Sequence, residues 1–474
     1  MTPGGLELDV AADPIANETS LANRALAVLD ANWLGSATSP SRRLYPHQWS
    51  WDAACIAMGR AAWDQDRAET ELRSLFAGQW RNGLLPHIVF TKHARYFPGP
   101  EFWQTGRNAD APRSPETSGI VQPPIHGTAI LEVSRQGPDR ARSQAFLEEL
   151  QPKLAAWHEY LYRERTREGS TLVEIWHPWE SGMDNSPLWD EALDRIALAP
   201  DQVPDYRRID VDVAEASERP TDEEYDRYAY LVSLYRELDY ESAAIRDATP
   251  FAMRPVLFNA LLVQGDLDLA EISELVGLSG DAYRDRAETT AREIDVALWD
   301  DESAVYADVD VRAGRFVPAR SAAGLAPLLA GVPDVARAAR MVERLADSRV
   351  PIGDAFAVTS QAPGEPGFQP TRYWRGPIWP ILNWVLQRGL DRYGYGAQAV
   401  QVRRAMLELA DRSGFWEHYS PVTGQGHGGA EFAWTAGLTL DLLRSEADTE
   451  GARMDEVAGA DVDRDTATHE RRDL

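Results

Sequence analysis

The sequence predicts an all-α fold of roughly a dozen helices, about the number that an (α/α)6 barrel, a toroid of six helical hairpins, requires. Apolar residues recur at helical spacing over most of the 474-residue chain. Strand-like alternation is rare, and no fixed sequence period indicates a solenoid of repeats. We therefore expect one large helical domain with a few short strands in its loops.

Four segments show the one-sided apolar pattern of amphipathic helices. In chain order they are Ala68, Leu72, Leu75, Phe76 and Trp80 within 66–80; Phe146, Leu150, Leu154, Trp157 and Leu161; Tyr225, Tyr228, Val232 and Tyr235; and Val335, Ala338, Met341 and Leu345. At the start of the first segment, Asp66 and Glu69 resemble a capping pair. Residues 377–388 are apolar nearly all round, which indicates an inner helix of a two-layered arrangement.

The clearest strand pattern is the alternating segment from Ala304 to Val311. The dipeptide Ala313-Gly314 follows it and offers a turn. We therefore predict a short hairpin between this segment and the residues after the turn.

Composition changes near both ends of the chain. Residues 446–474 are rich in Asp, Glu and Ala and have almost no large apolar side chains, which predicts a disordered acidic tail. Residues 1–15 are expected to be flexible. No linker rich in Pro, Gly or Ser interrupts the part between, so we predict a single folded domain over 16–445.

The formal net charge is −27 at neutral pH. This charge argues against nucleic acid, an anionic membrane surface or a polyanionic substrate as the partner. Only Lys92 and Lys153 are lysines, and all other basic residues apart from histidine are arginines. Abundant acidic residues with few lysines are typical of salt adaptation, but a genome of high GC content also exchanges Lys for Arg, and the sequence leaves both explanations open.

Cys55 is the only cysteine, so no intramolecular disulfide can form and a reducing cytoplasm is the expected location. The first residues are acidic and lack an apolar signal core, and no stretch approaches the roughly 18 apolar residues of a membrane span. We therefore expect a cytoplasmic protein without a membrane partner that acts on a small molecule. The sequence leaves the oligomeric state open, a homo-oligomer included.

The sixteen tryptophans gather with charged and turn residues, mostly in segments that precede predicted helices. These segments are 45–52 (YPHQWSWD), 79–83 (QWRNG), 175–189 (IWHPWESGMDNSPLW), 372–379 (RYWRGPIW) and 415–417 (FWE). Aromatic faces bind apolar surfaces while their polar edges meet hydroxyls. The placement favours a sugar-binding pocket, with ordinary core packing as the alternative.

Two carboxylates lie within these aromatic segments: Asp184 in 177–190 and Glu417 in 414–424. Glycoside hydrolysis needs one protonated carboxyl to assist the leaving oxygen and one ionised carboxylate to activate water or attack the sugar. Ser186 and Pro187 predict a helix start just after Asp184, so this side chain can project into a pocket. Alternatively, Asp184 is merely a capping group and Glu417 a solvated surface group.

Nine motifs together resemble glycoside hydrolase family 63, in particular its short bacterial members that hydrolyse glucosylglycerate or mannosylglycerate. In chain order they are YPHQWSWDAA, QWRNGLLPHIVF, YFPGP, TSGIVQPP, HPWESGMDNSP, RPTDEEYDRY, YWRGPIWP, FWEHYSPVTG and EFAWTAG. The resemblance extends from about Tyr45 to Leu443. It implies an (α/α)6 barrel, an inverting mechanism, and an α-linked glucose or mannose on glycerate as the substrate.

The resemblance also implies roles for the two carboxylates. Asp184 falls on the family's general acid, and Glu417 falls on its general base, in a loop after a helix that ends near Gly414. His418 replaces the first tyrosine of the family's FxEYY pattern, which puts the surroundings of the attacking water in doubt. Glu180 is expected either to bind a sugar hydroxyl or to hold Asp184 in place.

The remaining site residues that the resemblance implies fall into three groups. The glycone would be bound by Tyr45, Trp49, Trp51 and Asp52; further aromatic walls would come from Trp179, Tyr373, Trp374 and Trp379; and the glycerate would be bound by Arg219 and Tyr225, with hydroxyl contacts from Tyr96 and Gln122. Asp52 has the alternative role of a helix cap after Ser50. Thr221 and Glu224 predict a capping box beside Arg219, where a helix N-terminus favours an anion.

The sequence therefore predicts an inverting α-glycosidase that acts on a small anionic glycoside, with glucosylglycerate and mannosylglycerate as the leading candidates. A trehalase-like or α-glucosidase activity on neutral sugars, or a catalytically inactive sugar-binding protein, are the alternatives. The nine histidines show no metal-binding spacing, so we expect no metal and no cofactor. Glu431 stands near the position where the glucosylglycerate enzymes are expected to have a glutamine, which leaves the choice between glucose and mannose open.

Overall fold

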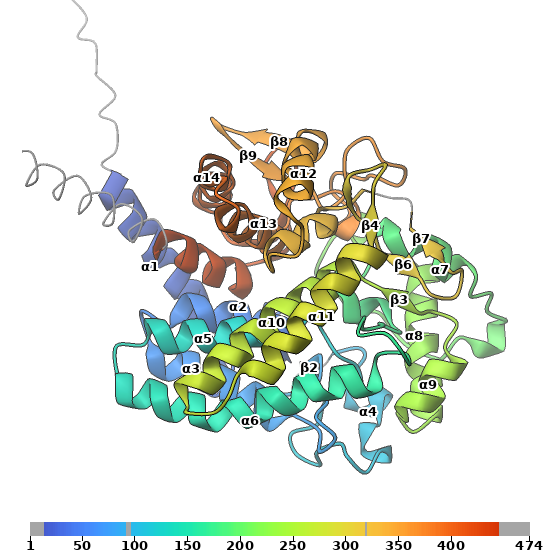
Figure 1. Cartoon of the computed structure of the whole chain (residues 1–474). Helices are drawn as coiled ribbons and strands as arrows, with labels where there is room; N and C mark the ends of the chain where they lie inside the picture. Colours follow the sequence, from blue (N-terminus) through green and yellow to red (C-terminus); the bar gives the residue numbers. More distant parts are fainter. Residues whose placement is uncertain (1–13, 92–95, 318–319, 445–474) are drawn as a thin grey trace, which may run out of the picture.

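The computed structural model describes residues 14–91, 96–317 and 320–444, and this part of the chain is mostly helical, as predicted (Figure 1). The helices are α1 (Pro14–Asn32), α2 (Ser50–Arg60), α3 (Gln65–Ala77), α4 (Pro100–Trp103), α5 (His126–Gln136), α6 (Arg140–Glu164), α7 (Asp190–Asp194), α8 (Asp222–Glu237), α9 (Ser242–Ala248), α10 (Val256–Leu275), α11 (Asp281–Ala297), α12 (Val335–Ser348), α13 (Pro380–Arg392) and α14 (Gly396–Ser413). Residues 433–444 are helical as well. The tail predicted for 446–474 lies outside the described residues, as does most of the flexible segment predicted for 1–15.

The strands are short and lie between helices. They are β1 (Gln48–Trp49), β2 (Ile88–Val89), β3 (Met253–Arg254), β4 (Trp299–Asp300), β5 (Val305–Tyr306), β6 (Val309–Asp310), β7 (Arg315–Phe316), β8 (Arg349–Ile352), β9 (Ala355–Val358), β10 (Trp416–Tyr419) and β11 (Gly426–Ala430). All strand pairs are antiparallel, and β3, β6 and β7 form one three-stranded sheet. The predicted hairpin after Ala313-Gly314 is confirmed as β6 and β7, whereas β5 pairs with β4.

Neighbouring helices pack as hairpins: α2 with α3, α5 with α6, α10 with α11, and α13 with α14. The first helix of one hairpin contacts the first helix of the next, since α5 packs against both α2 and α10. A 3₁₀ segment, Ala322–Leu328, packs against both α10 and α13 and so continues this row of contacts. These first helices therefore form an inner layer, and α3, α6, α11 and α14 cover them from outside.

Burial follows this layering. Every residue of α2 is buried, and α10 and α13 bury most of theirs, whereas α11 buries only Ala287, Thr290 and Ile294. An outer helix needs apolar residues on one stripe only, because its other face meets water. The predicted amphipathic segments are confirmed as parts of α3, α6, α8 and α12, except that α3 ends at Ala77 and Trp80 lies beyond it.

Two sequence expectations about helix starts were wrong. Asp64, rather than Asp66, is the N-cap of α3, and its side chain accepts a hydrogen bond from Arg67 N. Glu69 is instead fully buried and pairs with Arg73 and Arg142, so its carboxylate joins α3 to α6. The inner helix predicted for 377–388 begins at Pro380, because Pro is favoured in the first turn of a helix.

The core is continuous through both layers. One large apolar cluster extends across the hairpins, and a second, smaller one joins α1 to the helical residues 433–444, which lie beside it in Figure 1. In the described part of the chain, no helix is both long enough and apolar enough to cross a membrane. The segments that lead into the inner helices meet at one end of the layer, and there they enclose a cavity.

Candidate active site

A cavity lies where these segments meet. It is lined by Pro40, Tyr45, Trp49, Trp51, Asp52, His87, Tyr96, Pro98, Gln122, Trp179, Gly182, Asp184, Arg219, Pro220, Tyr225, Tyr373, Trp374, Glu417, Phe432 and Trp434. The structure thus brings together Asp184 and Glu417, which are separated by more than two hundred residues in the chain. All predicted substrate-binding residues except Glu180 and Trp379 line the same cavity.

Aromatic rings form most of the wall. Trp51 packs its edge against Trp434 with ring centres 5.3 Å apart and lies 6.2 Å from Trp374, while Tyr45 contacts Trp49 at 5.1 Å. Rings fixed by such contacts present flat apolar surfaces with little freedom to move. Not all tryptophans serve the cavity, however, because Trp103, Trp157, Trp176, Trp189 and Trp384 are fully buried away from its lining.

Asp184 lies in the turn between two short 3₁₀ helices, Pro178–Ser181 and Pro187–Trp189. The predicted helix start is confirmed: the Ser186 side chain accepts a hydrogen bond from Leu188 N. The Tyr228 hydroxyl donates to the backbone carbonyl of Asp184 at 2.9 Å, so the main chain is held while the carboxyl faces the cavity. Burial raises the pKa of Asp184 to about 7, against the attraction of Arg219 and with the help of the negative charge of Glu417.

Glu417 lies on β10 rather than in the loop that the sequence predicted. The preceding helix does end where expected, with Gly414 as the C-cap of α14, but the chain then pairs with β11. Between the pairs Trp416–Ala430 and His418–His427, β10 has one residue, Glu417, where β11 has two, Gly428 and Gly429, so the β-bulge lies on β11 opposite Glu417. Bulges are frequent next to active sites because they redirect one side chain out of the regular alternation.

The β11 side of this hairpin holds the Glu417 carboxylate. Gly429 N donates to Oε2 at 3.1 Å, and the Tyr45 hydroxyl donates to Oε1 at 2.9 Å. A Cβ atom at Gly428 would lie only 2.3 Å from Oε2, and the φ of this residue is +73°. Burial raises the pKa of Glu417, whereas Arg219 and the hydrogen bond from Tyr45 lower it in part.

Two tyrosines connect the carboxyl groups. The Tyr45 hydroxyl lies 3.0 Å from the Tyr373 hydroxyl, which lies 3.5 Å from Asp184 Oδ2. With the 2.9 Å contact of Tyr45 to Glu417, these lengths limit the distance from Asp184 Oδ2 to Glu417 Oε1 to about 9.4 Å or less, against roughly 6.5–9.5 Å in inverting glycosidases. No direct hydrogen bond joins the two carboxyl groups among the described residues.

Asp52 is the third carboxyl group of the cavity. It lies in the first turn of α2, whose N-cap is Trp49, so it does not cap the helix. Burial and the negative charge of Glu417 raise its pKa well above the usual value. Gln122 lies beside this helix start and accepts a hydrogen bond from Trp51 N through Oε1, which leaves its amide group toward the cavity.

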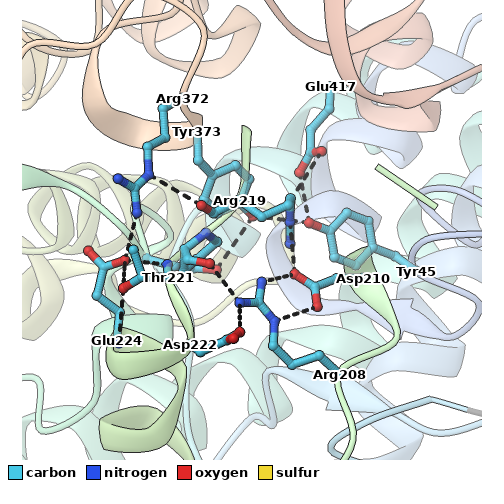
Figure 2. A network of polar contacts seen from close by, with 12 residues as sticks. Tyr45, Arg208, Asp210, Arg219, Thr221, Asp222, Glu224, Arg372, Tyr373 and Glu417 are labelled. Atoms are coloured by element: carbon cyan, nitrogen blue, oxygen red, sulfur yellow. Dashed lines mark hydrogen bonds and ion pairs between the residues drawn. The ribbon is translucent and has the colours of Figure 1, made fainter. Parts of the chain in front are cut away.

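Arg219 is the cation of the cavity wall and is itself buried. Its guanidinium lies over the Tyr373 ring at 4.2 Å, and Nη1 is 3.8 Å from Glu417 Oε2 (Figure 2). The predicted capping box between Thr221 and Glu224 is confirmed at the start of α8, two residues further along. Arg372 fixes this turn, since it donates to the carbonyl of Arg219 and to Glu224 Oε2.

Two predicted site residues have other positions. Glu180 is fully buried and forms two hydrogen bonds with Arg165, and it also accepts backbone N–H groups of Val121 and Trp176, so its lone pairs are used within the fold. The Trp379 ring stacks on Trp374 at 3.5 Å and lies behind it. Both residues support the cavity wall without lining it.

The two sequence departures lie away from the cavity lining. His418 is buried beside Trp379, with 4.7 Å between ring centres, and burial lowers its pKa well below the usual value. Glu431 is exposed and has a φ of +50°, and its backbone carbonyl accepts a hydrogen bond from Asn32. Neither side chain lines the cavity.

Sequence reasoning missed several lining residues and one residue behind the lining. Phe432 and Trp434 stand in the quoted motif EFAWTAG, so the motif could have indicated them. Asp210 forms an ion pair with Arg219 but stands in a segment without tryptophan, and no pattern in the sequence marks it. Within the described ranges, no group of three or more His, Cys, Asp or Glu side chains is arranged to hold a metal ion.

Comparisons with known proteins agree with this geometry. Residues 45–435 match the family model of the mannosylglycerate hydrolase MGH1-like glycoside hydrolase domain. The chain is 45% identical to the mannosylglycerate hydrolase of Rubrobacter radiotolerans, over 89% of this chain and 96% of that one, and 37% identical to the glucosylglycerate hydrolase of Mycolicibacterium hassiacum, over 91% and 99%. The crystal structure of the family 63 mannosylglycerate hydrolase of Thermus thermophilus with Tris and D-glycerate superposes with a TM-score of 0.83, at 40% identity over 89% and 99% of the two chains.

Proposed function

The chain belongs to the mannosylglycerate hydrolase MGH1-like glycoside hydrolases of family 63, and on this premise we propose that it hydrolyses an α-linked sugar of glycerate with inversion at the anomeric carbon. Family membership makes the chain a glycoside hydrolase. One observation carries the more specific proposal: two carboxyl groups, connected by two tyrosine hydroxyls, share a cavity with a buried arginine.

Asp184 acts as the general acid. With a pKa of about 7 it holds its proton near neutrality, where an ordinary aspartate is ionised. The proton passes to the glycosidic oxygen as the bond from this oxygen to the anomeric carbon breaks, so the oxygen leaves as a neutral hydroxyl group of the glycerate, whose carboxylate keeps its charge. Asp184 is left ionised after this step.

Glu417 acts as the general base. Its hydrogen bonds from Tyr45 and Gly429 and the charge of Arg219 favour the ionised form against the effect of burial. A water molecule on the face of the sugar opposite the leaving group gives one proton to Glu417, while its oxygen bonds to the anomeric carbon. The sugar is thereby released with inverted configuration.

The aromatic walls and Asp52 bind the glycone. Trp51, Trp374 and Trp434 offer flat faces for the apolar side of a hexose. Asp52 offers oxygen atoms to its hydroxyls and, because its pKa is raised, can also donate a proton in such a hydrogen bond. The relatives include a mannosylglycerate hydrolase and a glucosylglycerate hydrolase. No single contact in the described cavity lining selects mannose or glucose.

Arg219 binds the carboxylate of the glycerate. Its Nη1 forms no hydrogen bond with any described residue, and an unpaired buried N–H group gains most from a charged acceptor. Tyr225, Tyr96 and Gln122 line the same cavity and supply hydroxyl and amide groups for the rest of the small acid. A neutral disaccharide would offer no charged acceptor to Arg219 Nη1, which makes the trehalase-like alternative the weaker one.

The proposal also covers the fold of the catalytic domain and the cellular location of the protein. The hairpins around an inner layer support a six-hairpin (α/α)6 toroid as the catalytic domain, over residues 16–445. The one cysteine, Cys55, is free and buried, which supports a cytoplasmic location. The substrate is a small molecule, in agreement with a cavity that is lined by aromatic rings and a few polar side chains.

Proton NMR of the released sugar tests the mechanism. The protein is incubated with α-mannosylglycerate, α-glucosylglycerate and, separately, trehalose, and the anomeric signals are followed before mutarotation. We expect cleavage of at least one glycerate compound with the β-anomer appearing first. If the α-anomer appears first, a covalent intermediate forms and the roles of Asp184 and Glu417 are wrong.

Replacement of Arg219 tests the substrate class. Arg219→Gln should raise the KM for the glycerate compound by a factor of about 10² or more, because a charge-assisted contact is lost. The KM for an uncharged glycoside of the same sugar should change little. Arg227→Gln is the matched control, since Arg227 lies on α8 outside the cavity lining. Equal losses on charged and uncharged substrates would exclude a carboxylate-binding role.

A further inference from the structure

Asp210 lies directly behind Arg219 and is as deeply buried as its partners. Its Oδ2 accepts a hydrogen bond from Arg219 Nε at 3.1 Å, and both of its oxygens accept from Arg208, at 3.0 and 2.7 Å. Figure 2 shows the carboxylate between the two guanidinium groups. Asp210 itself does not line the cavity, so it cannot touch a bound substrate.

Arg219 is thus held between two carboxylates at unequal distances. Asp210 binds Nε at hydrogen-bond distance, whereas Glu417 Oε2 is 3.8 Å from Nη1, which is too long for a hydrogen bond. In a buried site an arginine and a carboxylate gain most from a close, two-pronged contact. The bond to Asp210 opposes such a contact between Arg219 and Glu417, because it holds the guanidinium from the other side.

A direct pair between Arg219 and Glu417 would harm the reaction in two ways. It would lower the pKa of Glu417 further and so make the carboxylate a weaker base. It would also occupy an oxygen of Glu417 that has to accept a proton from water. In the same way it would occupy a nitrogen of Arg219 that has to bind the carboxylate of the substrate. The base and the cation can both work only while they stay apart.

We propose that Asp210 is a positioning residue that holds Arg219 away from Glu417, so that Arg219 stays available to the substrate's carboxylate and Glu417 to water. This proposal rests on the roles of Arg219 and Glu417 in the proposed function. Asp210 acts through Arg219 and makes no contact with the reacting atoms.

Arg208 makes this arrangement possible. If Arg219 were the only arginine beside Asp210, its positive charge would be shared between Asp210 and Glu417. Arg208 supplies a second positive charge to Asp210. Arg208 also donates to the carbonyl of Pro220 and to Asp222, and its guanidinium lies 4.5 Å above the Tyr225 ring. Burial by itself would raise the pKa of Asp210, yet the two arginines hold it below the usual value, so the carboxylate stays charged.

The first test is the pH dependence of kcat/KM for Asp210→Asn. Five groups face Glu417 and share in setting its pKa: Tyr45, Asp52, Asp184, Arg219 and Tyr373. In the variant, Arg219 is free to approach Glu417, so the acid limb of the profile should move to lower pH and the maximal rate should fall about tenfold or more. An acid limb at the wild-type pH overturns the proposal, whichever glycoside is cleaved.

Asp222→Asn is the matched control. It removes one negative charge from the same network, but its carboxylate pairs with Arg208 rather than Arg219 and is 90% exposed. Its pH profile should equal that of the wild type. Asp210→Glu keeps the charge and tests the proposal even where the asparagine variant does not fold: its acid limb should stay in place, and a shift to lower pH would contradict the proposal.

A double-mutant cycle separates this inference from the proposed function. If Asp210 acts through Arg219, Asp210→Asn should change kcat/KM less than about twofold in the Arg219→Gln background. Additive losses mean that Asp210 acts independently, and the positioning role is then wrong. Failure of the proposed function looks different: Arg219→Gln alone would then affect charged and uncharged substrates equally.

Discussion

The Tyr45 hydroxyl donates a 2.9 Å hydrogen bond to Glu417 Oε1 and lies 3.0 Å from the Tyr373 hydroxyl. The pKa of Glu417 therefore depends on a residue from the far end of the chain, in the segment before α2. A hydrogen bond to the ionised form of a carboxyl lowers its pKa, and here this effect opposes the effect of burial.

Loss of this hydrogen bond should move the acid limb in the opposite direction to Asp210→Asn. In Tyr45→Phe the pKa of Glu417 rises, so a higher pH is needed to ionise the base, and the acid limb of kcat/KM shifts to higher pH. The shift in both variants is measured by the kinetics of one substrate between about pH 4 and 9. This range covers roughly the pH values at which perturbed carboxyls titrate. A limb that moves to lower pH in Tyr45→Phe would rule out its role as donor to the ionised base.

Replacement of the two carboxyl groups should distinguish the acid from the base. Asp184→Asn and Glu417→Gln should each slow hydrolysis of the natural type of substrate by about 10²–10⁴ or more, without loss of folding by circular dichroism. A glycosyl fluoride of the same sugar needs little acid assistance, because fluoride is a good leaving group. It should therefore restore turnover in Asp184→Asn and not in Glu417→Gln, and restoration in both or in neither would contradict the assignment.

The alkaline limb of the pH profile should belong to Asp184. Because this carboxyl has to be protonated and its pKa is about 7, kcat/KM should fall about tenfold for each pH unit above this value. An ordinary aspartate would have lost its proton well below this pH. With the glycosyl fluoride, Asp184→Asn should show no alkaline limb, and a limb that persists there would have to come from another group.

Gly428→Ala should impair the base by a direct clash. The new Cβ would lie 2.3 Å from Glu417 Oε2 in a residue whose φ is +73°. Gly169→Ala is the control for backbone strain, since Gly169 has a φ of +78° and no atom within 4 Å of the added Cβ. Both variants should lose about 1 kcal/mol of stability from the left-handed conformation, but only Gly428→Ala should lose activity as well. Equal activity in the two variants would show that Glu417 can move without harm.

Glu71 should make stability depend on pH away from the cavity. It is fully buried, its Oε1 accepts a hydrogen bond from Gln48, and burial raises its pKa to about 8. Between the unfolded value near 4.5 and about 8 the folded protein binds one proton more than the unfolded chain, so stability falls as pH rises through this range. Thermal unfolding should show Glu71→Gln gaining in Tm relative to the wild type from about pH 5 to about pH 8, and a constant difference would contradict the raised pKa.

The sequence alone determined the helical class, the helices with the clearest apolar stripes, and most of the site. Periodicity is a local property, so the stripes of α3, α6, α8 and α12 could be identified without coordinates. Asp184 and Glu417, the proposed acid and base, could be predicted because they stand in short segments where aromatic, turn and acidic residues occur together. The capping box beside Arg219 was found for the same reason, since its two side chains are three residues apart.

Only the tertiary structure decided which side chains share the cavity and what surrounds them. Glu180 stands near Asp184 in sequence, yet its carboxylate bonds to Arg165 and to the backbone of Val121 and does not line the cavity. The strand pairing that places Glu417 opposite a bulge depends on residues about ten positions later. Asp210 became visible only beside Arg219 and Arg208, because the effect of a buried charge depends on neighbours in space, and neighbours across a fold leave no periodic pattern in the sequence.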